Sequence, residues 1–284
     1  MKELLLDILT EWGMSSIYIL IFAVILLISK FFKRIIYKDN VDVQLTEKDN
    51  VAYGISIGGY FIGVFAIYVG ALIGPSVDLL QDIINVVAYA LGGIAIMFLS
   101  SWVNDHGIFR RVAIRKEIKE KHNIAAAIVQ LASLLASGLM IAGAIKGEGG
   151  GPLQALVFYC IGQVFLVLFT KGYIKFRSYD IQHQIHEGNI AVAFSVAGKM
   201  ISIGLIVMIA IGHDFQGWGK TFIMICMDGT IMIFLLLVVS YFFDKLIIPK
   251  SDLDYELVED KNIGVGVLDF CVNLMVSLLV LFLF

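Results

Sequence analysis

The sequence predicts an all-α integral membrane protein in which eight transmembrane helices form four αα-hairpins, arranged as two parallel tandem four-helix repeats. Three observations support this fold class: the apolar composition, the spacing of the apolar runs and an internal repeat. The 284 residues are 59% hydrophobic, with a mean hydropathy of +0.89. Soluble domains are only about 45–50% apolar, so this composition favours a membrane protein.

The apolar residues come in runs of about twenty, and each run is long enough to cross a hydrocarbon layer roughly 30 Å thick. A helix satisfies its own backbone hydrogen bonds within one segment, which makes it the expected spanning structure. In chain order, we expect spans at residues 14–36, 51–73, 82–103, 124–145, 153–175, 190–212, 219–243 and 262–283.

The chain matches itself without a gap when it is shifted by 139 residues. Asn50, Ser56 and Gly59 then fall on Asn189, Ser195 and Gly198, and Glu117 and Asn123 fall on Glu256 and Asn262. An ungapped duplication implies that both copies fold alike. We therefore divide the chain into a first repeat, residues 1–146, and a second repeat, residues 147–284. Each copy holds an even number of spans, so both should have the same orientation in the membrane, unlike inverted repeats.

Positive charge is distributed unevenly between the two sides of the predicted bundle. The segments after the first, third, fifth and seventh spans, with the adjoining span ends, hold 17 of the 21 Lys and Arg residues. Lys and Arg accumulate on the cytoplasmic side of membrane proteins. These four longer loops should therefore be cytoplasmic, and both termini should lie on the outer side.

An asparagine stands at the start of every even-numbered span: Asn50, Asn123, Asn189 and Asn262. Glu47, Glu120 and Glu259 lie three residues before three of them, and Glu187 lies two residues before the other. Asn is a strong N-cap residue, and an acid is favoured near the positive end of a helix dipole. One interpretation is purely structural. The alternative is that the four side chains converge at the cytoplasmic mouth of a solute pathway.

This pattern of an apolar hairpin, a charged loop, an acid and Asn-x-Ala-x-Ala resembles the YjfL-type bacterial inner-membrane proteins, domain-of-unknown-function family 350. The resemblance covers essentially the whole chain as two copies of the family's four-span unit. The fourth copy of the motif departs by having Gly264 and Gly266 where Ala is usual. The resemblance implies a bacterial plasma membrane, with both termini then periplasmic, and it implies no established chemistry.

Ionisable residues within spans are functional candidates because burying them in lipid is costly. Lys199 lies ten residues into the sixth span and Asp228 lies nine residues into the seventh. The two spans are joined by a short loop, so these residues should lie at similar depths. We expect Lys199 and Asp228 to be spatial partners, either as a structural ion pair or as part of a transport site.

Other polar residues within spans add to this set. Asp269 and Gln130 occupy equivalent positions seven residues after Asn262 and Asn123, and Asn273 lies one turn beyond Asp269. Gln163 and Asn85 lie in the fifth and third spans. Together these residues either line a hydrated interior or form hydrogen bonds between helices.

No recognisable motif predicts catalysis, a cofactor or a metal site. His183 and His186 have a spacing that suits a metal on a helix, but they lie in a charged loop, and we interpret them as solvated. Cys160, Cys226 and Cys271 lie in spans as small apolar residues. The net charge of −3 and the lack of a basic tract argue against nucleic-acid binding. We therefore expect a protein that is not an enzyme. An enzyme acting on a lipid head group is the weaker alternative.

Two functions remain. The first is a channel or transporter for a cation or small polar solute, with Lys199, Asp228, Asp269, Gln130 and Asn273 as pathway candidates. The second is a membrane scaffold that recruits a peripheral cytoplasmic protein in envelope stress. For the scaffold, residues 104–123 with their basic cluster offer a docking surface or a surface for anionic lipid. The lipid bilayer is the expected partner in both, and an oligomer is compatible with both.

Overall fold

The computed structural model describes the backbone of residues 2–74, 78–147, 151–247, 249 and 251–283. The side chains of residues 2–11, 243, 244 and 247 are outside this description. Every regular element in the described part of the chain is helical, as the composition predicts. Within that part, eight helices are long and apolar enough to cross a membrane.

The eight long helices are α1 (Lys2–Tyr37), α2 (Val51–Leu72), α3 (Leu79–Gly107), α5 (Ile124–Lys146), α6 (Pro152–Phe176), α8 (Ile190–Ile211), α9 (Trp218–Ile247) and α11 (Ile263–Leu283). The sequence did not predict the short helices that precede the even-numbered spans. These are the π-helix η1 (Val43–Glu47), α4 (Ile114–Glu120), α7 (Ile181–His186) and α10 (Leu253–Val258). Each hairpin therefore consists of a long helix, a short helix and a second long helix.

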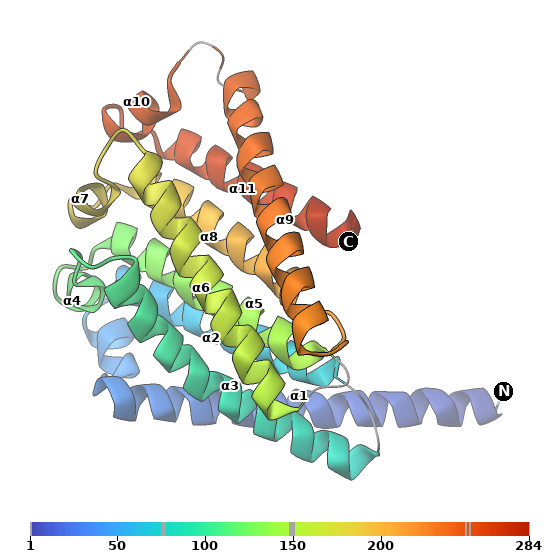
Figure 1. Cartoon of the computed structure of the whole chain (residues 1–284). Coiled ribbons are helices and arrows are strands. Elements are labelled where there is room, and N and C mark those ends of the chain that lie inside the picture. The colour runs from blue at the N-terminus through green and yellow to red at the C-terminus, as the bar shows by residue number, and fades with distance from the viewer. Residues whose placement is uncertain (1, 75–77, 148–150, 248, 250, 284) are drawn as a thin grey trace.

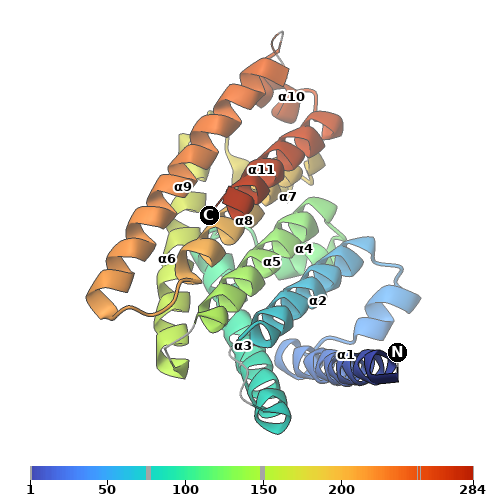
Figure 2. The ribbon, with the colours of Figure 1, turned by 90° about the vertical axis from the view of Figure 1, so that its right-hand side faces the viewer.

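The four helices that follow a short helix form a row at the centre of the molecule. The most extensive contacts in the structure link α2 to α5, α5 to α8, and α8 to α11. The four lie side by side and begin at the same end (Figure 2). In their most apolar parts, 78% of the residues of α5 and 83% of those of α8 are buried inside the protein, against 11% for α1. We call α2, α5, α8 and α11 the core row.

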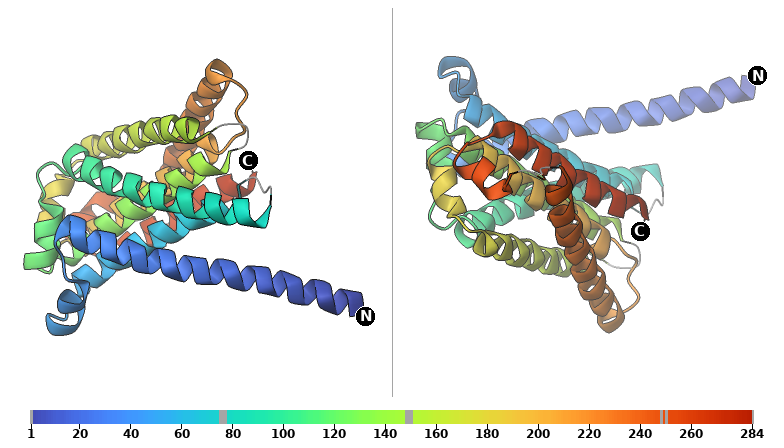
Figure 3. Two further views of the ribbon diagram at one scale, coloured as in Figure 1. Left: turned by 90° about the horizontal axis from the view of Figure 1, so that it is seen from below. Right: turned by 90° about the horizontal axis from the view of Figure 1, so that it is seen from above.

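The remaining long helices, α1, α3, α6 and α9, run in the opposite direction outside the core row (Figure 1). Helix α1 extends past its neighbours, and both termini lie at the end away from the short helices (Figure 3). The two repeats do not form separate bodies, because α5 of the first repeat packs along α8 of the second.

Small residues allow the core-row helices to approach closely. A Cβ added to Gly59 would lie 2.5 Å from Cα of Leu131, and one added to Gly204 would lie 2.7 Å from Cα of Ala136. At such distances a backbone would have to move. Lipid gives apolar helices little reason to associate, so close backbone packing of this kind is a main source of stability in membranes.

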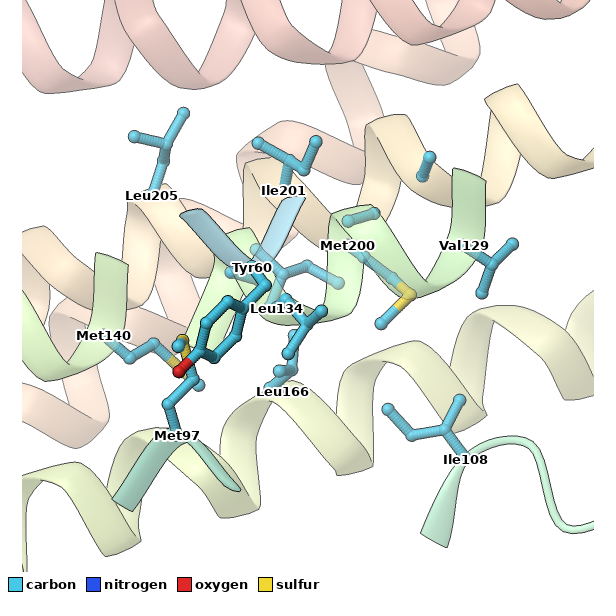
Figure 4. Close-up of a cluster of buried hydrophobic side chains, with 14 of the residues drawn as sticks. Tyr60, Met97, Ile108, Val129, Leu134, Met140, Leu166, Met200, Ile201 and Leu205 are labelled. Atoms are coloured by element: carbon cyan, nitrogen blue, oxygen red, sulfur yellow. The ribbon is translucent and has the colours of Figure 1, made fainter. Parts of the chain in front are cut away.

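Larger apolar side chains fill the spaces between the core row and the outer helices. Val129, Leu134 and Met140 of α5 belong to the same buried cluster as Met97 of α3 and Met200 of α8 (Figure 4). This packing holds α3 and α6 against the row.

Helix α11, the last of the core row, has Met and Cys at two positions where α2 and α8 have smaller residues. The small residues Gly63 and Ser202, which stand 13 residues after the capping Asn of α2 and α8, correspond in α11 to Met275, which is 56% exposed. Cys271 of α11 occupies the position of Gly59 and Gly198 and is also exposed. Met275 thus places a long side chain where α2 and α8 have small residues.

Neighbouring glycines of α2 provide a direct test of this packing. Gly58→Ala meets no atom within 4 Å and should stabilise the protein, because Ala in a helix is favoured over Gly by about 1 kcal/mol. Gly59→Ala should lower the thermal unfolding midpoint in detergent, because its methyl group meets the α5 backbone. Equal midpoints for the two variants would contradict the close contact.

Candidate functional site

The end of the core row where its helices begin carries the asparagine motif, and we call it the capped end. Each Asn side chain caps its own helix. The Oδ1 atoms of Asn50, Asn123 and Asn189 each accept a hydrogen bond from the backbone N–H three residues later in the chain, at 2.9, 3.1 and 3.2 Å. Asn262 makes the same bond at 3.3 Å. These bonds satisfy amides that the helix itself leaves unpaired.

The residue before each Asn has a left-handed backbone conformation. Asp49, His122, Gly188 and Lys261 have φ angles of 47°, 53°, 78° and 47°. A residue of this kind ends a helix and turns the chain sharply. Three of the four are not glycine, and each of these carries a cost of about 1–2 kcal/mol. The turn from short helix to core helix is therefore imposed by contacts around the Asn.

The other side-chain atom of the Asn joins neighbouring hairpins. Nδ2 of Asn50 donates to the carbonyl oxygen of Ile118 at 2.9 Å, and Nδ2 of Asn123 donates to that of Ile185 at 2.9 Å. Nδ2 of Asn189 donates to the Leu257 carbonyl at 2.8 Å. Each of these three Asn residues thus links its own helix to the short helix of the next hairpin. Asn262, in the last hairpin, is exposed.

A second polar residue supports each Asn, and it is not the acid that the sequence suggested. The Nδ2 atoms also donate to side-chain oxygens of Gln44, Glu117, Gln184 and Glu256, which lie five or six residues earlier. Glu47, Glu120, Glu187 and Glu259 are exposed. The favourable position of these acids near the positive end of each helix dipole stays a prediction.

Glu117 has the most developed environment of these supporting residues. Burial alone would raise the pKa of its carboxyl group, but hydrogen bonds from Lys121 and Asn123 and the nearby His186 ring outweigh burial and lower this pKa. Nδ1 of His186 lies 3.1 Å from Oε1 of Glu117. The His186 ring therefore has a structural contact, and among the described residues no group of three or more side chains forms a metal site.

The four Asn side chains are arranged along the row, each between two hairpins. Asn50, Asn123 and Asn189 are buried between adjacent units. The idea that they converge on one mouth does not fit this arrangement, because parallel helices in a row separate their starting points.

A buried polar cluster lies between α8 and α11 in the second repeat. It contains Lys199, Asp269, Asn273, Ser195 and Ser240, each at most 3% exposed. We call it the polar core cluster. Three of its members, Lys199, Asp269 and Asn273, were pathway candidates from the sequence.

The hydrogen bonds of the polar core cluster centre on Asp269 and Asn273. Oδ1 of Asp269 lies 3.4 Å from Nζ of Lys199 and accepts Nδ2 of Asn273 at 2.7 Å. Its Oδ2 accepts the Ser195 hydroxyl at 2.5 Å. Oδ1 of Asn273 accepts Lys199 at 2.5 Å and the Ser240 hydroxyl, from α9, at 2.7 Å. The ammonium and the carboxylate are thus both compensated inside the bundle.

The expected pairing of Lys199 with Asp228 is wrong. Oδ2 of Asp228 lies 3.4 Å from Nε2 of His213, and the Asp228 side chain is 37% exposed. The depth estimate placed both residues in the middle of the bundle, but depth does not fix the direction in which a side chain leaves its helix. Lys199 instead faces α11, where Asp269 lies at a similar depth.

Neither α2 nor α5 places a charged side chain in the corresponding interface of the first repeat, although Lys33 of α1 lies beside it, 5.0 Å from the Tyr60 ring centre. Ser56 of α2 donates to Gln130 of α5, in the place of Ser195 and Asp269. Tyr60 replaces Lys199 and donates to the Ser29 carbonyl at 3.0 Å, and Leu134 replaces Asn273. Gln130 is therefore a counterpart of the polar core cluster in the other repeat and does not belong to the cluster.

A line of polar contacts joins the polar core cluster to the capped end. The Tyr173 hydroxyl lies 3.0 Å from Oγ of Ser195, and the guanidinium of Arg177 lies 4.9 Å from the Tyr173 ring centre. Arg177 then donates to Asp254 at 2.5 Å. No sequence pattern singles out Tyr173, because an aromatic residue near a span end is ordinarily an interface anchor.

The remaining polar candidates lie elsewhere. Gln163 donates to Asn104 of α3 at 2.6 Å, and Asn104 in turn donates to Ser133 of α5 at 2.8 Å. Asn104 was not among the sequence candidates. Asn85 accepts a hydrogen bond from Gln81 on its own helix. These contacts are hydrogen bonds within or between helices.

Substitution of Asn189 should separate its two roles. Asn189→Asp keeps the cap acceptor but removes the donor to Leu257, leaving a buried carbonyl unpaired at a cost of about 1–3 kcal/mol. Asn262→Asp should have a smaller effect, because Asn262 is exposed at the end of the row. Thermal unfolding in detergent measures both, and equal losses would argue against the link between hairpins.

The ion pair of the polar core cluster should respond cooperatively. Lys199→Met or Asp269→Leu alone leaves an uncompensated buried charge, which costs about 3–5 kcal/mol. The double variant should be more stable than either single variant. Asp228→Asn is the control on a partly exposed acid, and it should change the free energy of unfolding little. Additive losses for Lys199 and Asp269 in unfolding measurements would contradict their contact.

Comparisons with known proteins agree with the repeated architecture. The pattern of the family described as Domain of Unknown Function (DUF350) matches residues 7–145 and again residues 149–283. The UPF0719 transmembrane protein YshE of Bacillus subtilis (strain 168) is 26% identical over 133 residues, which cover 45% of this chain and 90% of that protein. No solved structure matches.

A second relative aligns across both repeats. A UPF0719 transmembrane protein of Aquifex aeolicus (strain VF5) is 22% identical over 204 residues, covering 69% of this chain and 75% of that protein. The two family matches together cover nearly all of the chain, and they meet beside the Gly147 that follows α5. This polytopic transmembrane protein therefore belongs to the DUF350 family, with two tandem copies of the family unit in one chain.

Proposed function

We propose that this protein is a channel or transporter for a cation or small polar solute, and that the polar core cluster is the site in the membrane that the solute or a coupled proton meets. The observation that carries the proposal is the buried contact of Lys199 with Asp269 and Asn273. Ionisable groups in transmembrane helices are costly and usually mark a pathway.

The first repeat supports a functional role over a purely structural one. Its α2–α5 interface is also closely packed, since a Cβ added to Gly59 would lie 2.5 Å from Cα of Leu131. It nevertheless contains Tyr60, Gln130 and Leu134 where the second repeat has Lys199, Asp269 and Asn273. A close helix contact in this fold therefore needs no buried ion pair. The charges of the second repeat call for another explanation.

The chemistry of the polar core cluster suits a cation. Asp269 is a carboxylate whose counter-ion is a flexible ammonium, so a proton or a cation that reaches Asp269 competes directly with Lys199. Serine and amide oxygens around it offer further ligands of the kind that hard cations prefer. Tyr173 and Arg177 connect this site to the capped end.

We further propose that the capped end is cytoplasmic and that both termini are periplasmic in a bacterial inner membrane, because Lys and Arg are concentrated at the capped end. In a chain without its native cysteines, a single cysteine at Lys220 should react with an impermeant reagent in intact cells. A cysteine at Lys48 should react only after permeabilisation, and the reverse result would invert the orientation.

Flux measurements in liposomes test the transport proposal. The purified full-length chain should move at least one member of a panel of protons, alkali cations and polyamines. Asp269→Asn should reduce that flux by about tenfold or more, the effect of losing one strong charge-assisted contact. Asp228→Asn is the matched control, since it is the same change at an acid outside the polar core cluster, and it should retain flux.

The short helices favour a second candidate, a scaffold for a peripheral cytoplasmic protein. Arg111 of the loop before α4 pairs with Asp180 before α7 at 2.9 Å, and the side chains are 74% and 47% exposed. This forms a charged surface across two repeats. If no solute moves and only Arg110→Gln with Lys116→Gln has a phenotype in cells, the scaffold is correct and the transport proposal is wrong.

A further inference from the structure

We propose that the first repeat holds a binding site for a phosphate-like anion, formed by Lys33, Tyr53, Arg115 and Lys119 at the capped end. We call it the anion pocket. It lies in the other repeat from the polar core cluster and does not depend on the transport proposal. Its cavity has a volume of about 30 Å³ and extends inward to Ser56 and Gln130.

Lys33 at the base of the pocket is a buried cation, and Asp39, the carboxylate that lines the same cavity, pairs with Lys119. The Lys33 side chain comes from α1 and is 5% exposed. Its Nζ lies 5.3 Å from the ring centre of Tyr53 and 5.0 Å from that of Tyr60. Among the described residues no carboxylate forms an ion pair with Lys33. Aromatic rings compensate a buried ammonium only partly, so Lys33 is without the full compensation that an ion pair gives.

Tyr53 provides a second unsatisfied group. The residue is 2% exposed, and its hydroxyl has no hydrogen-bond partner among the described residues. Buried hydroxyl groups nearly always have a partner. Tyr53 also lines the anion pocket. A buried ammonium and a buried hydroxyl that both lack an acceptor therefore border the same cavity, and one anion satisfies both.

The mouth of the pocket is positively charged. Arg115 and Lys119 of α4 line it with side chains that are 40% and 33% exposed. Lys119 pairs with Asp39, and Arg115 pairs with Asp105 at 3.5 Å while its guanidinium stacks 3.9 Å from the Tyr37 ring centre. Counted with these partners, the pocket has three cations and two anions, and Lys33 is the cation without an ion pair among the described residues. A cavity with this excess attracts anions and repels cations.

The donors suit a phosphate group better than a monatomic anion. Lys33 supplies an ammonium, Arg115 a planar guanidinium and Tyr53 a hydroxyl, and these approach the cavity from α1, α4 and α2. A tetrahedral anion can accept from several directions at once, and Arg recognises phosphate with paired donors. The phosphate group belongs either to a soluble ion or to a lipid, because α4 lies at the end of the spans.

The second repeat has lost this site. The positions of Lys33, Tyr53, Arg115 and Lys119 are occupied there by Gly172, Val192, Asp254 and Val258. The common fold therefore does not require these four side chains. Their presence together in one repeat is a specific feature of the first copy.

Thermal unfolding in lipid nanodiscs tests the proposal with inorganic phosphate as the probe. In phosphatidylcholine discs, phosphate should raise the unfolding midpoint of the full-length protein beyond the effect of chloride at equal ionic strength, because a ligand stabilises the state that binds it. A second set of discs contains phosphatidic acid. A rise only in these discs identifies a lipid headgroup as the source, and a rise with free phosphate identifies a soluble anion.

Two variants and a control make the test specific. Lys33→Met should raise the midpoint without phosphate, because it removes an unpaired buried charge, and it should weaken anion binding by about 30-fold or more. Tyr53→Phe keeps the ring and should weaken binding roughly tenfold, as expected for one hydrogen bond to a charged group. Lys30→Met removes a neighbouring cation of α1, which pairs with Asp42 outside the pocket, and should bind like the unmodified protein.

The proposal is overturned by either of two results. One is that neither phosphate nor phosphatidic acid stabilises the protein beyond the chloride control. The other is that Tyr53→Phe and Lys33→Met respond to both as the unmodified protein does. Since Tyr53→Phe removes a single oxygen atom that has no partner, it should fold even if Lys33→Met does not.

Discussion

The close approach of four parallel helices is the constraint on which the rest of this structure depends. Lipid does not drive apolar helices together, so contact requires small residues such as Gly59 and Gly204 opposite a neighbouring backbone. Helices that start side by side also bring their unpaired first-turn amides together with the carbonyls of the next short helix. The buried Asn satisfies both at once, so packing along the row and hydrogen bonding at its end reinforce each other.

This frame allows the two repeats to differ inside. The same serine position bonds to Gln130 in the first repeat and to Asp269 in the second. In the first repeat the charges belong to Lys33 of α1 and to α4, while in the second they lie between α8 and α11. The glycine contacts persist beside both sets of polar residues, since Gly59 packs on Leu131 and Gly198 packs on Phe270. Duplication of one unit has therefore produced two distinct polar environments in one bundle.

Particular residues show how far the sequence can predict the site. The four Asn caps follow from local chemistry, because the cap acceptor and its amide are three residues apart. The support from Gln44 and Glu117 does not, because it depends on a turn through left-handed residues such as His122. Lys199 and Asp269 are separated by 70 residues, and only helix rotation decides whether Lys199 meets Asp269 or Asp228. The proposed roles of Tyr53 and Lys33 depend on the lack of a hydrogen-bond partner and of an ion pair among the described residues. A local sequence pattern does not predict such a lack.

The sequence by itself determined the number of spans, the duplication and the capped starts of the even-numbered helices. These properties are set by the thickness of the hydrocarbon layer and by hydrogen bonds between near neighbours in the chain. The tertiary structure decided that the even-numbered helices form one row, that the Asn residues link hairpins along it, and which buried charges meet. Those outcomes depend on the angle at which each side chain leaves its helix and on which backbones can approach closely, and both are properties of the assembled bundle.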